Sequence, residues 1–114
     1  MKNCKRSTRE ILNKKIFSLI GLATRAGKTV SGEFSTEKAV KAFKAEIVIV
    51  AEDASDNTKK LFTDKCNFYE VPCYVFGTKE QLGHAMGKEL RASLAVTDYG
   101  FAQQLCKLLD ETRN

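Results

Sequence analysis

Residues 46–51 read Glu-Ile-Val-Ile-Val-Ala, an unbroken run of β-branched and small apolar residues near the middle of the chain. A run without polar alternation is typical of a strand that is buried on both faces, because both faces then carry apolar side chains. Such a strand lies in a sheet that helices cover on both sides. We therefore expect helical segments before and after this run.

Helical and strand patterns alternate along the rest of the chain, which predicts an α/β fold: one domain with a central sheet between helices. Apolar segments predict three further strands at residues 28–31, 71–76 and 93–97. Apolar residues at helical spacing predict the packed faces of four helices. These faces comprise Ile11, Leu12, Ile16, Leu19, Ile20 and Ala23; Thr36, Ala39, Val40 and Phe43; Leu61, Phe62, Cys66 and Tyr69; and Phe101, Leu105, Leu108 and Leu109.

Capping residues mark where several of these helices begin. Ser55 can cap the third helix and Asp98 the last, because both side chains accept hydrogen bonds from first-turn N–H groups. Thr78 and Gln81 have the spacing of a capping box, which predicts a short fourth helix.

Composition limits the class of protein. At 114 residues the chain can bury a core without disulfides, and we expect its thiols to be reduced in a cytoplasmic protein. The spacing of the cysteines and the single histidine predicts neither a metal site nor a cofactor site. The apolar segment 16–23 has helical periodicity, so we interpret it as a packed helix, not a signal peptide, and we expect no membrane span. The cysteines are Cys4, Cys66, Cys73 and Cys106.

No arrangement of residues predicts a catalytic site, and we expect a protein that is not an enzyme. Spacing places no nucleophile or carboxylate near His84, and Glu52 and Asp53 are explained as helix-leading acids. Residues 27–29, Gly-Lys-Thr, match the end of a phosphate-binding loop, but that pattern requires glycine where Leu22 stands.

Positive charge is concentrated at one end of the chain. Residues 1–32 carry eight cations against Glu10 alone, a local net charge of +7 in a chain of net charge +5. A basic end on a nearly neutral body favours a polyanionic partner, of which RNA or DNA is the usual one. We expect residues 1–8 to form a basic, flexible leader and residues 9–114 to form the domain.

Residues 25–38, Arg-Ala-Gly-Lys-Thr-Val-Ser-Gly-Glu-Phe-Ser-Thr-Glu-Lys, are where this partner is expected to bind. Glycines, hydroxyls and cations lead into a helical pattern, and a helix start presents unpaired N–H groups to phosphate. At about 100° per residue, Phe34, Lys38 and Lys41 share one face, which combines a ring for stacking with two cations. Two alternatives stay open: a Phe34 ring turned into the core, and lysines on an ordinary solvated face.

Several spaced motifs resemble those of the kink-turn-binding ribosomal protein superfamily, over about residues 11–109. The resemblance implies a three-layer α/β/α sandwich with a central four-stranded mixed sheet. It also implies non-catalytic binding of structured RNA in a ribosome or translation context, and it implies no oligomer. The motifs are Gly32…Lys38-Ala-Val, Ile47-Val-Ile-Val-Ala-Glu-Asp53, Cys66…Val71-Pro72-Cys-Tyr-Val, Thr78-Lys-Glu-Gln-Leu-Gly83…Gly87 and, most similar to the bacterial YlxQ branch, Leu22-Ala-Thr-Arg-Ala-Gly-Lys-Thr-Val-Ser-Gly32.

The resemblance further implies that RNA meets the start of the second helix and the loop before the last strand, expected within residues 83–91. Gly32 and Lys38 match the family pattern Gly-x-Asn-Glu-x-Thr-Lys, whereas residues 34–35, Phe-Ser, replace the Asn-Glu pair that reads paired purines. Leu90 stands where the family covers an extruded base. The expected RNA-binding residues are Arg25, Lys28, Ser31, Gly32, Glu33, Phe34, Ser35, Lys38, Lys41, Glu89, Leu90 and Arg91.

A second class of function also fits the sequence. The chain can be a protein-interaction or assembly factor of a ribonucleoprotein, with only non-specific RNA contact. Salt separates the two, because phosphate binding weakens steeply as salt rises and an apolar protein interface does not.

Overall fold

The centre of the sheet is β2 (Ile47–Val50), and all of its residues are buried. It pairs in parallel with β3 (Cys73–Val75) and antiparallel with β4 (Ser93–Val96), and β4 pairs antiparallel with β1 (Thr29–Ser31). The sheet therefore has the order β1-β4-β2-β3. The structure, a computed structural model, describes residues 8–112. It confirms that the run at 46–51 forms a strand buried on both faces.

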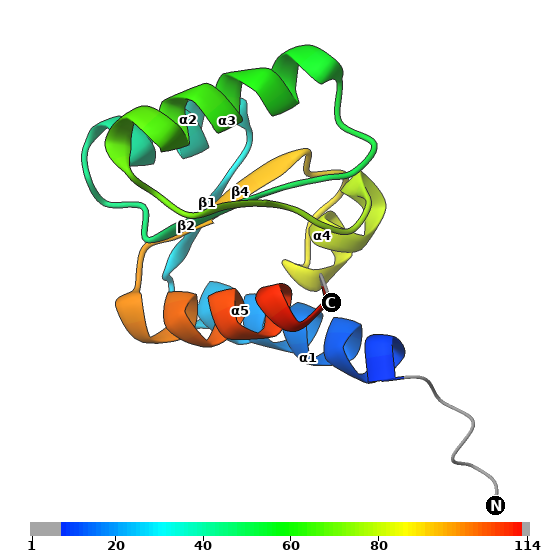
Figure 1. Ribbon diagram of the computed structural model, residues 1–114. Helices are drawn as coiled ribbons and strands as arrows, with labels where there is room; N and C mark the ends of the chain where they lie inside the picture. Colours follow the sequence, from blue (N-terminus) through cyan, green and yellow to red (C-terminus); the bar gives the residue numbers. More distant parts are fainter. Residues whose placement is uncertain (1–7, 113–114) are drawn as a thin grey trace, which may run out of the picture.

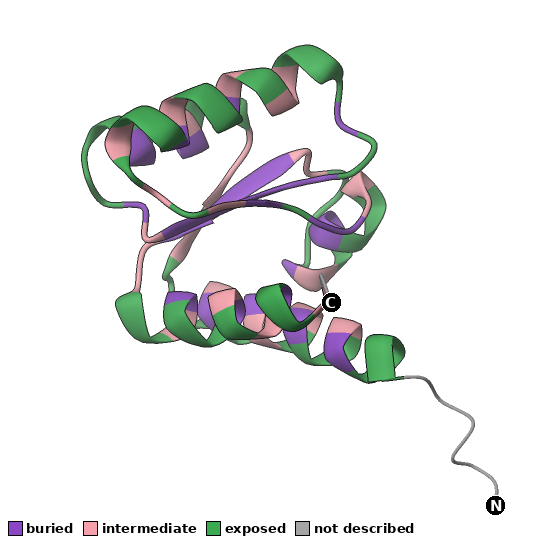
Figure 2. Ribbon diagram, in the orientation of Figure 1, coloured by how far each residue is buried: buried purple, intermediate pink, exposed green. Residues whose placement is uncertain are grey.

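Two layers of helices enclose this sheet (Figure 1). The helices α2 (Glu33–Lys41) and α3 (Asp56–Tyr69) cover one face, and α1 (Thr8–Arg25) and α5 (Tyr99–Thr112) cover the other. The short helix α4 (Lys79–Ala85) lies at one end of the sheet. Figure 2 shows buried residues in the strands and on the sides of the helices that face them. The expected α/β/α sandwich with a four-stranded mixed sheet is confirmed.

Most positions expected in the core are buried or packed against it, and two are not. Ile11 is exposed because it lies beside the buried stripe of α1, which follows Leu12, Ile16 and Ile20 at intervals of four residues. Phe43 is exposed because α2 ends before it, so the helical face that was extrapolated to residue 43 does not exist there.

The chain beyond α2 turns sharply. The N–H of Phe43 donates to the carbonyl of Val40, and the N–H of Lys44 donates to that of Ala39. This pair of bonds is the Schellman motif, which needs a left-handed residue after the helix. Phe43 occupies that position with φ 60°. The prediction that Phe43 packs on the α2 stripe is therefore wrong.

The predicted caps are confirmed. Ser55 Oγ accepts a hydrogen bond from the N–H of Thr58 at 3.1 Å, and Asp98 Oδ2 accepts one from the N–H of Phe101 at 3.0 Å. Residues 78 and 81 form both bonds of the capping box at the start of α4. Asp53 also caps a helix, but not the one that it precedes. Its Oδ1 accepts a 2.8 Å bond from the N–H of Lys79, so it holds the start of α4.

Some boundaries differ from those expected. The segment 83–91 is not all loop, because α4 continues to Ala85. Residue 8, expected in the basic leader, begins α1, and the other leader residues, 1–7, lie outside the described part of the chain. Within residues 8–112, no helix is both long and apolar enough to cross a membrane.

Candidate nucleic-acid interface

The chain passes from β1 into α2 through Gly32. This glycine has φ 90°, a conformation that residues with a side chain rarely adopt, so the strand runs into the helix without a connecting loop. Its N–H is not free, because it donates a 3.0 Å hydrogen bond to the carbonyl of Ser93 in β4. The start of α2 is thereby anchored to the sheet.

The first turn of α2 presents backbone N–H groups that the helix itself does not use. The N–H groups of Glu33, Phe34 and Ser35 precede the first intrahelical bond, which the N–H of Thr36 makes to Gly32. Gly32 has no side chain, and no side-chain cap is present. The positive end of the helix dipole therefore lies beside donors that can bind an anion.

The outer face of α2 carries the aromatic ring and the lysines that the sequence placed together. Phe34 is 77% exposed, so the alternative in which its ring enters the core does not hold. An open hollow follows this face of the helix. It is lined by Phe34, Glu37, Lys38, Lys41 and Ala42.

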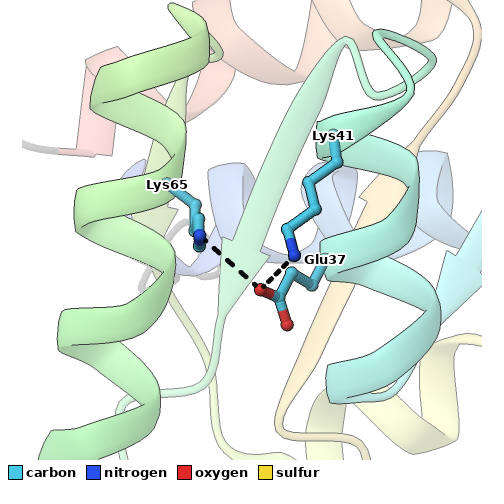
Figure 3. Close-up of polar contacts among 3 residues, drawn as sticks. All are labelled: Glu37, Lys41 and Lys65. Atoms are coloured by element: carbon cyan, nitrogen blue, oxygen red, sulfur yellow. Dashed lines mark ion pairs between the residues drawn. The ribbon is translucent and has the colours of Figure 1, made fainter.

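The lysines of this face differ in their surroundings. Glu37 Oε2 lies 3.2 Å from Lys41 Nζ and 3.9 Å from Lys65 Nζ of α3 (Figure 3). The positive charge of Lys41 is therefore partly neutralised. Lys38 makes no ion pair with any residue between 8 and 112, so its charge is available to a ligand. The sequence does not predict that Lys65 lies near Glu37, because this contact depends on how α3 packs beside α2.

The loop between α4 and β4 lies directly on α4. A Cβ atom at Gly83 would stand 1.5 Å from the carbonyl oxygen of Glu89, so only glycine allows the loop to pack there. The N–H of Arg91 donates to the carbonyl of Lys79, which ties down the other end of the loop. Between these two contacts the side chain of Leu90 is 59% exposed.

A side-chain contact joins this loop to the start of α2. Arg91 Nε donates a 2.9 Å hydrogen bond to Ser31 Oγ, and its Nη1 donates to the carbonyl of Leu90 at 2.8 Å. Ser31 immediately precedes Gly32. The structure therefore brings together residues 31–38 and 89–91, the two segments expected to form the site.

Two of the expected site residues lie elsewhere. The carbonyl of Lys28 accepts a bond from the N–H of Thr97, which places Lys28 at the opposite end of β1 from Gly32. Four residues of extended chain span about 13 Å. Arg25 is the last residue of α1, three residues before Lys28, and so lies farther still along the chain from Gly32. These cations can only meet a ligand that extends along β1.

The side chains at this surface suit an anion or a flat ring better than a metal ion. Within residues 8–112, no group of three or more His, Cys, Asp and Glu side chains is placed to hold a metal ion. An exposed ring, an unpaired lysine and the first-turn N–H groups of a helix are suited to binding flat rings and anions.

Together these features define a small α/β/α protein with a candidate polyanion-binding surface at the start of α2. The chain belongs to the ribosomal protein L7Ae/L30e/S12e/Gadd45 family, whose model matches residues 14–106. Family membership confirms the resemblance that the spaced motifs indicated.

Its relatives include bacterial and archaeal proteins. The chain is 50% identical to RNA-binding protein YlxQ of Bacillus subtilis (strain 168) over 94 residues, which are 82% of this chain and 94% of that protein. It is 28% identical to large ribosomal subunit protein eL8 of Thermoplasma volcanium over 101 residues, 88% and 84% of the two chains.

Solved structures share its architecture. A Bacillus halodurans protein of unknown function superposes with a TM-score of 0.82 at 42% identity, over 84% of this chain and 97% of that one. The 15.5kD RNA-binding protein of Giardia lamblia has a TM-score of 0.77 at 21% identity, over 94% and 99% of the two chains. At that identity the Giardia protein demonstrates a common fold.

Proposed function

We propose that this protein binds structured RNA, without catalysing a reaction, through the start of α2 and the loop between α4 and β4. The observation that carries the proposal is the Arg91–Ser31 contact, which ties the loop that carries exposed Leu90 to the residue before Gly32, where the helix with exposed Phe34 and unpaired Lys38 begins. The 50% sequence identity of the chain to a Bacillus subtilis protein named RNA-binding protein YlxQ also supports the proposal.

Each part of the surface suits a different part of an RNA. The first-turn N–H groups of α2 and the Lys38 ammonium suit phosphate oxygens. The Phe34 ring suits stacking on an unpaired base, which contributes about 1–3 kcal/mol per base. Leu90 offers an apolar cover for a base that leaves the stack. We infer a preference for RNA with bulges or loops over uninterrupted duplex.

Sequence reading is expected to be modest. Phe34 has no hydrogen-bond donor or acceptor for a base edge. It stands at the position where the family members that recognise kink-turns carry Asn. We propose that a kink-turn is bound chiefly through its shape, phosphates and extruded bases. The relationship to a large ribosomal subunit protein supports a translation context in the cytoplasm.

One titration tests the proposal. A kink-turn RNA, its purine-substituted version and a plain duplex of equal length are titrated at equal salt, and then over a series of salt concentrations. We expect the two kink-turns to bind within about tenfold of each other, or 1.4 kcal/mol, and the duplex to bind more weakly. We also expect affinity to fall steeply with salt.

Two results would contradict the proposal. A preference above about a hundredfold for the intact kink-turn, or 2.7 kcal/mol, would show that other groups read the purines. If the protein does not bind RNA, or if its affinity barely depends on salt, an assembly factor that works through protein contacts is favoured instead.

A further inference from the structure

Three aromatic rings gather at the other end of α2 from the proposed RNA site. Phe43 is 75% exposed and Phe68 is 78% exposed, and half-buried Tyr69 lies between them. The ring centroid of Tyr69 lies 5.4 Å from that of Phe43 and 4.9 Å from that of Phe68, and in both pairs the ring planes are nearly perpendicular. We call Phe43, Phe68 and Tyr69 the aromatic cluster.

The backbone of Phe43 indicates that this ring does not serve the fold. The left-handed position after a helix is usually glycine, because a side chain there is strained. Phe43 has φ 60° at this position, and most of its ring lies in solvent. A glycine would relieve the strain and would sacrifice little burial. A large exposed ring at such a position is better explained by a ligand.

The cluster is continuous with the proposed RNA site. The hollow along α2 runs from Phe34 to Ala42, and Ala42 immediately precedes Phe43. The two helices run side by side in the same direction, because Glu33 meets Thr58 near their starts and Phe43 meets Tyr69 near their ends. At about 1.5 Å per residue, α2 rises about 11 Å from Phe34 to its last residue, Lys41, and Phe43 follows in the turn beyond it. About four nucleotides stacked at about 3.4 Å each cover that rise and reach the turn.

The charges around the cluster suit an anion on its α2 side. Lys41 and Lys44 flank Phe43, and both are exposed. Glu37, the carboxylate of this face, is already bonded to two lysines. A second hollow beside Phe68 is lined by both Asp64 and Lys65 and so carries no excess of positive charge, and phosphates are therefore expected to follow α2 and not the outer face of α3. Exposed aromatic rings occur in protein–protein interfaces too, but lysine is depleted there, so the lysines beside the rings favour nucleic acid as the occupant.

We propose that a single-stranded segment of the bound RNA continues along α2 and stacks its bases on Phe43 and Phe68. Its phosphates lie against Lys41 and Lys44. The inference rests on the proposed function, because the segment extends from RNA held at the start of α2.

The test compares blunt and extended RNAs. One kink-turn RNA is prepared in three forms: blunt, with a 5′ single-stranded extension, and with a 3′ single-stranded extension. Each extension is about eight nucleotides long, twice the number needed to follow α2. We expect one of the two extensions to tighten binding to the unaltered protein about tenfold, as expected for stacking of a base. The double variant Phe43→Gly/Phe68→Ser should abolish this gain and bind the blunt RNA as before.

Matched controls separate binding from folding. Tyr99→Ser removes an exposed aromatic ring from α5, on the opposite layer, and should keep the whole gain. Phe43→Gly alone should unfold at the same temperature as the unaltered protein or a higher one. A 4-thiouridine placed in the favoured extension should crosslink to the aromatic cluster.

The possible failures are distinct. If the blunt RNA does not bind, the proposed function fails. If it binds and neither extension tightens binding, or if the gain survives in the double variant, only this inference is overturned. Crosslinks confined to residues outside the cluster overturn it as well, and a protein partner then becomes the alternative occupant.

Discussion

Arg91 Nε lies 2.9 Å from Ser31 Oγ, and this hydrogen bond joins two residues that are 60 positions apart in the chain. The bond links the loop before β4 to the residue that precedes α2. Arg91 also bonds the carbonyl of Leu90, so one guanidinium connects the backbone of the exposed Leu90 to the residue that leads into α2. The guanidinium therefore adds a side-chain link between the two halves of the proposed site, beside the backbone pairing of β1 with β4.

Removing the acceptor of this bond tests the positioning. We expect Ser31→Ala to weaken binding of a kink-turn RNA by about 0.5–1.5 kcal/mol, the usual net value of one hydrogen bond. No cation is lost, so the dependence of affinity on salt should stay unchanged. Titration at several salt concentrations measures both quantities. The control is Ser18→Ala, which removes a hydroxyl group from an exposed position on α1. A flatter salt dependence in Ser31→Ala would show that Arg91 had lost a phosphate contact instead.

The two lysines of α2 should differ in their effect on binding. Lys38→Ala is expected to weaken RNA binding by about 1–2 kcal/mol, because it removes a charge-assisted phosphate contact. Lys41→Ala should cost less, because Glu37 already neutralises part of that charge. Lys107→Ala, on the opposite layer, is the matched control. RNA titration with thermal unfolding of each variant provides the measurement. Earlier unfolding of Lys38→Ala with normal binding of the folded protein would make Lys38 a structural residue.

Gly83 is predicted to be indispensable for the loop. The Cβ atom of Gly83→Ala would collide with the carbonyl of Glu89, so the loop must move away from α4. We expect a loss of about 2 kcal/mol or more in the free energy of unfolding, as for other overpacked sites. RNA affinity of the folded protein should also fall, because Leu90 moves with the loop. Chemical denaturation and RNA titration measure the two effects.

Gly100→Ala is the comparison for Gly83→Ala. Its Cβ atom would lie 3.3 Å from Asp98 Oδ2, the oxygen that caps α5, and alanine favours the helix. We expect stability to change much less than in Gly83→Ala, because a side chain can shift by a few tenths of an ångström and the Glu89 backbone cannot. Equal effects of the two substitutions would mean that the Glu89 contact does not hold the loop.

The contact between Tyr74 and α5 makes stability depend on pH. Tyr74 Oη donates a 2.8 Å hydrogen bond to Asp110 Oδ1. Burial, and then this carboxylate, raise the pKa of Tyr74 above its ordinary value, and burial also raises the pKa of Cys106 beside it. A pKa that is higher in the folded state gives stability that is present below the unfolded value, about 10 for tyrosine, and is lost as pH rises further.

We therefore expect the free energy of unfolding to begin to fall as pH rises above about 8.5, from Cys106, and to fall further above about 10, from Tyr74. Tyr74→Phe should make this fall shallower, although it removes one hydrogen bond and lowers stability at neutral pH by about 1 kcal/mol. Denaturation in steps of pH gives both slopes. Identical slopes would show that Tyr74 ionises equally easily in the folded and unfolded chains.

Local patterns predicted the fold well. The buried run at 46–51, the caps at Ser55 and Asp98 and the capping box at the start of α4 involve residues close together in the chain, so the sequence shows them directly. The end of α2 was missed, because phenylalanine is not a residue that usually marks a left-handed turn. The site residues were predicted from the family resemblance and from helical periodicity, and not from a chemical motif.

By itself, the sequence determined the order of helices and strands, the sheet between two helical layers and the shared face of Phe34 and Lys38. Periodicity and capping act over a few residues, so they can be read along the chain. Only the tertiary structure decided which lysine is free, which carboxylate is occupied and how the loop at Leu90 meets the start of α2. Those features depend on side chains from distant segments, and packing alone brings such segments within hydrogen-bond distance.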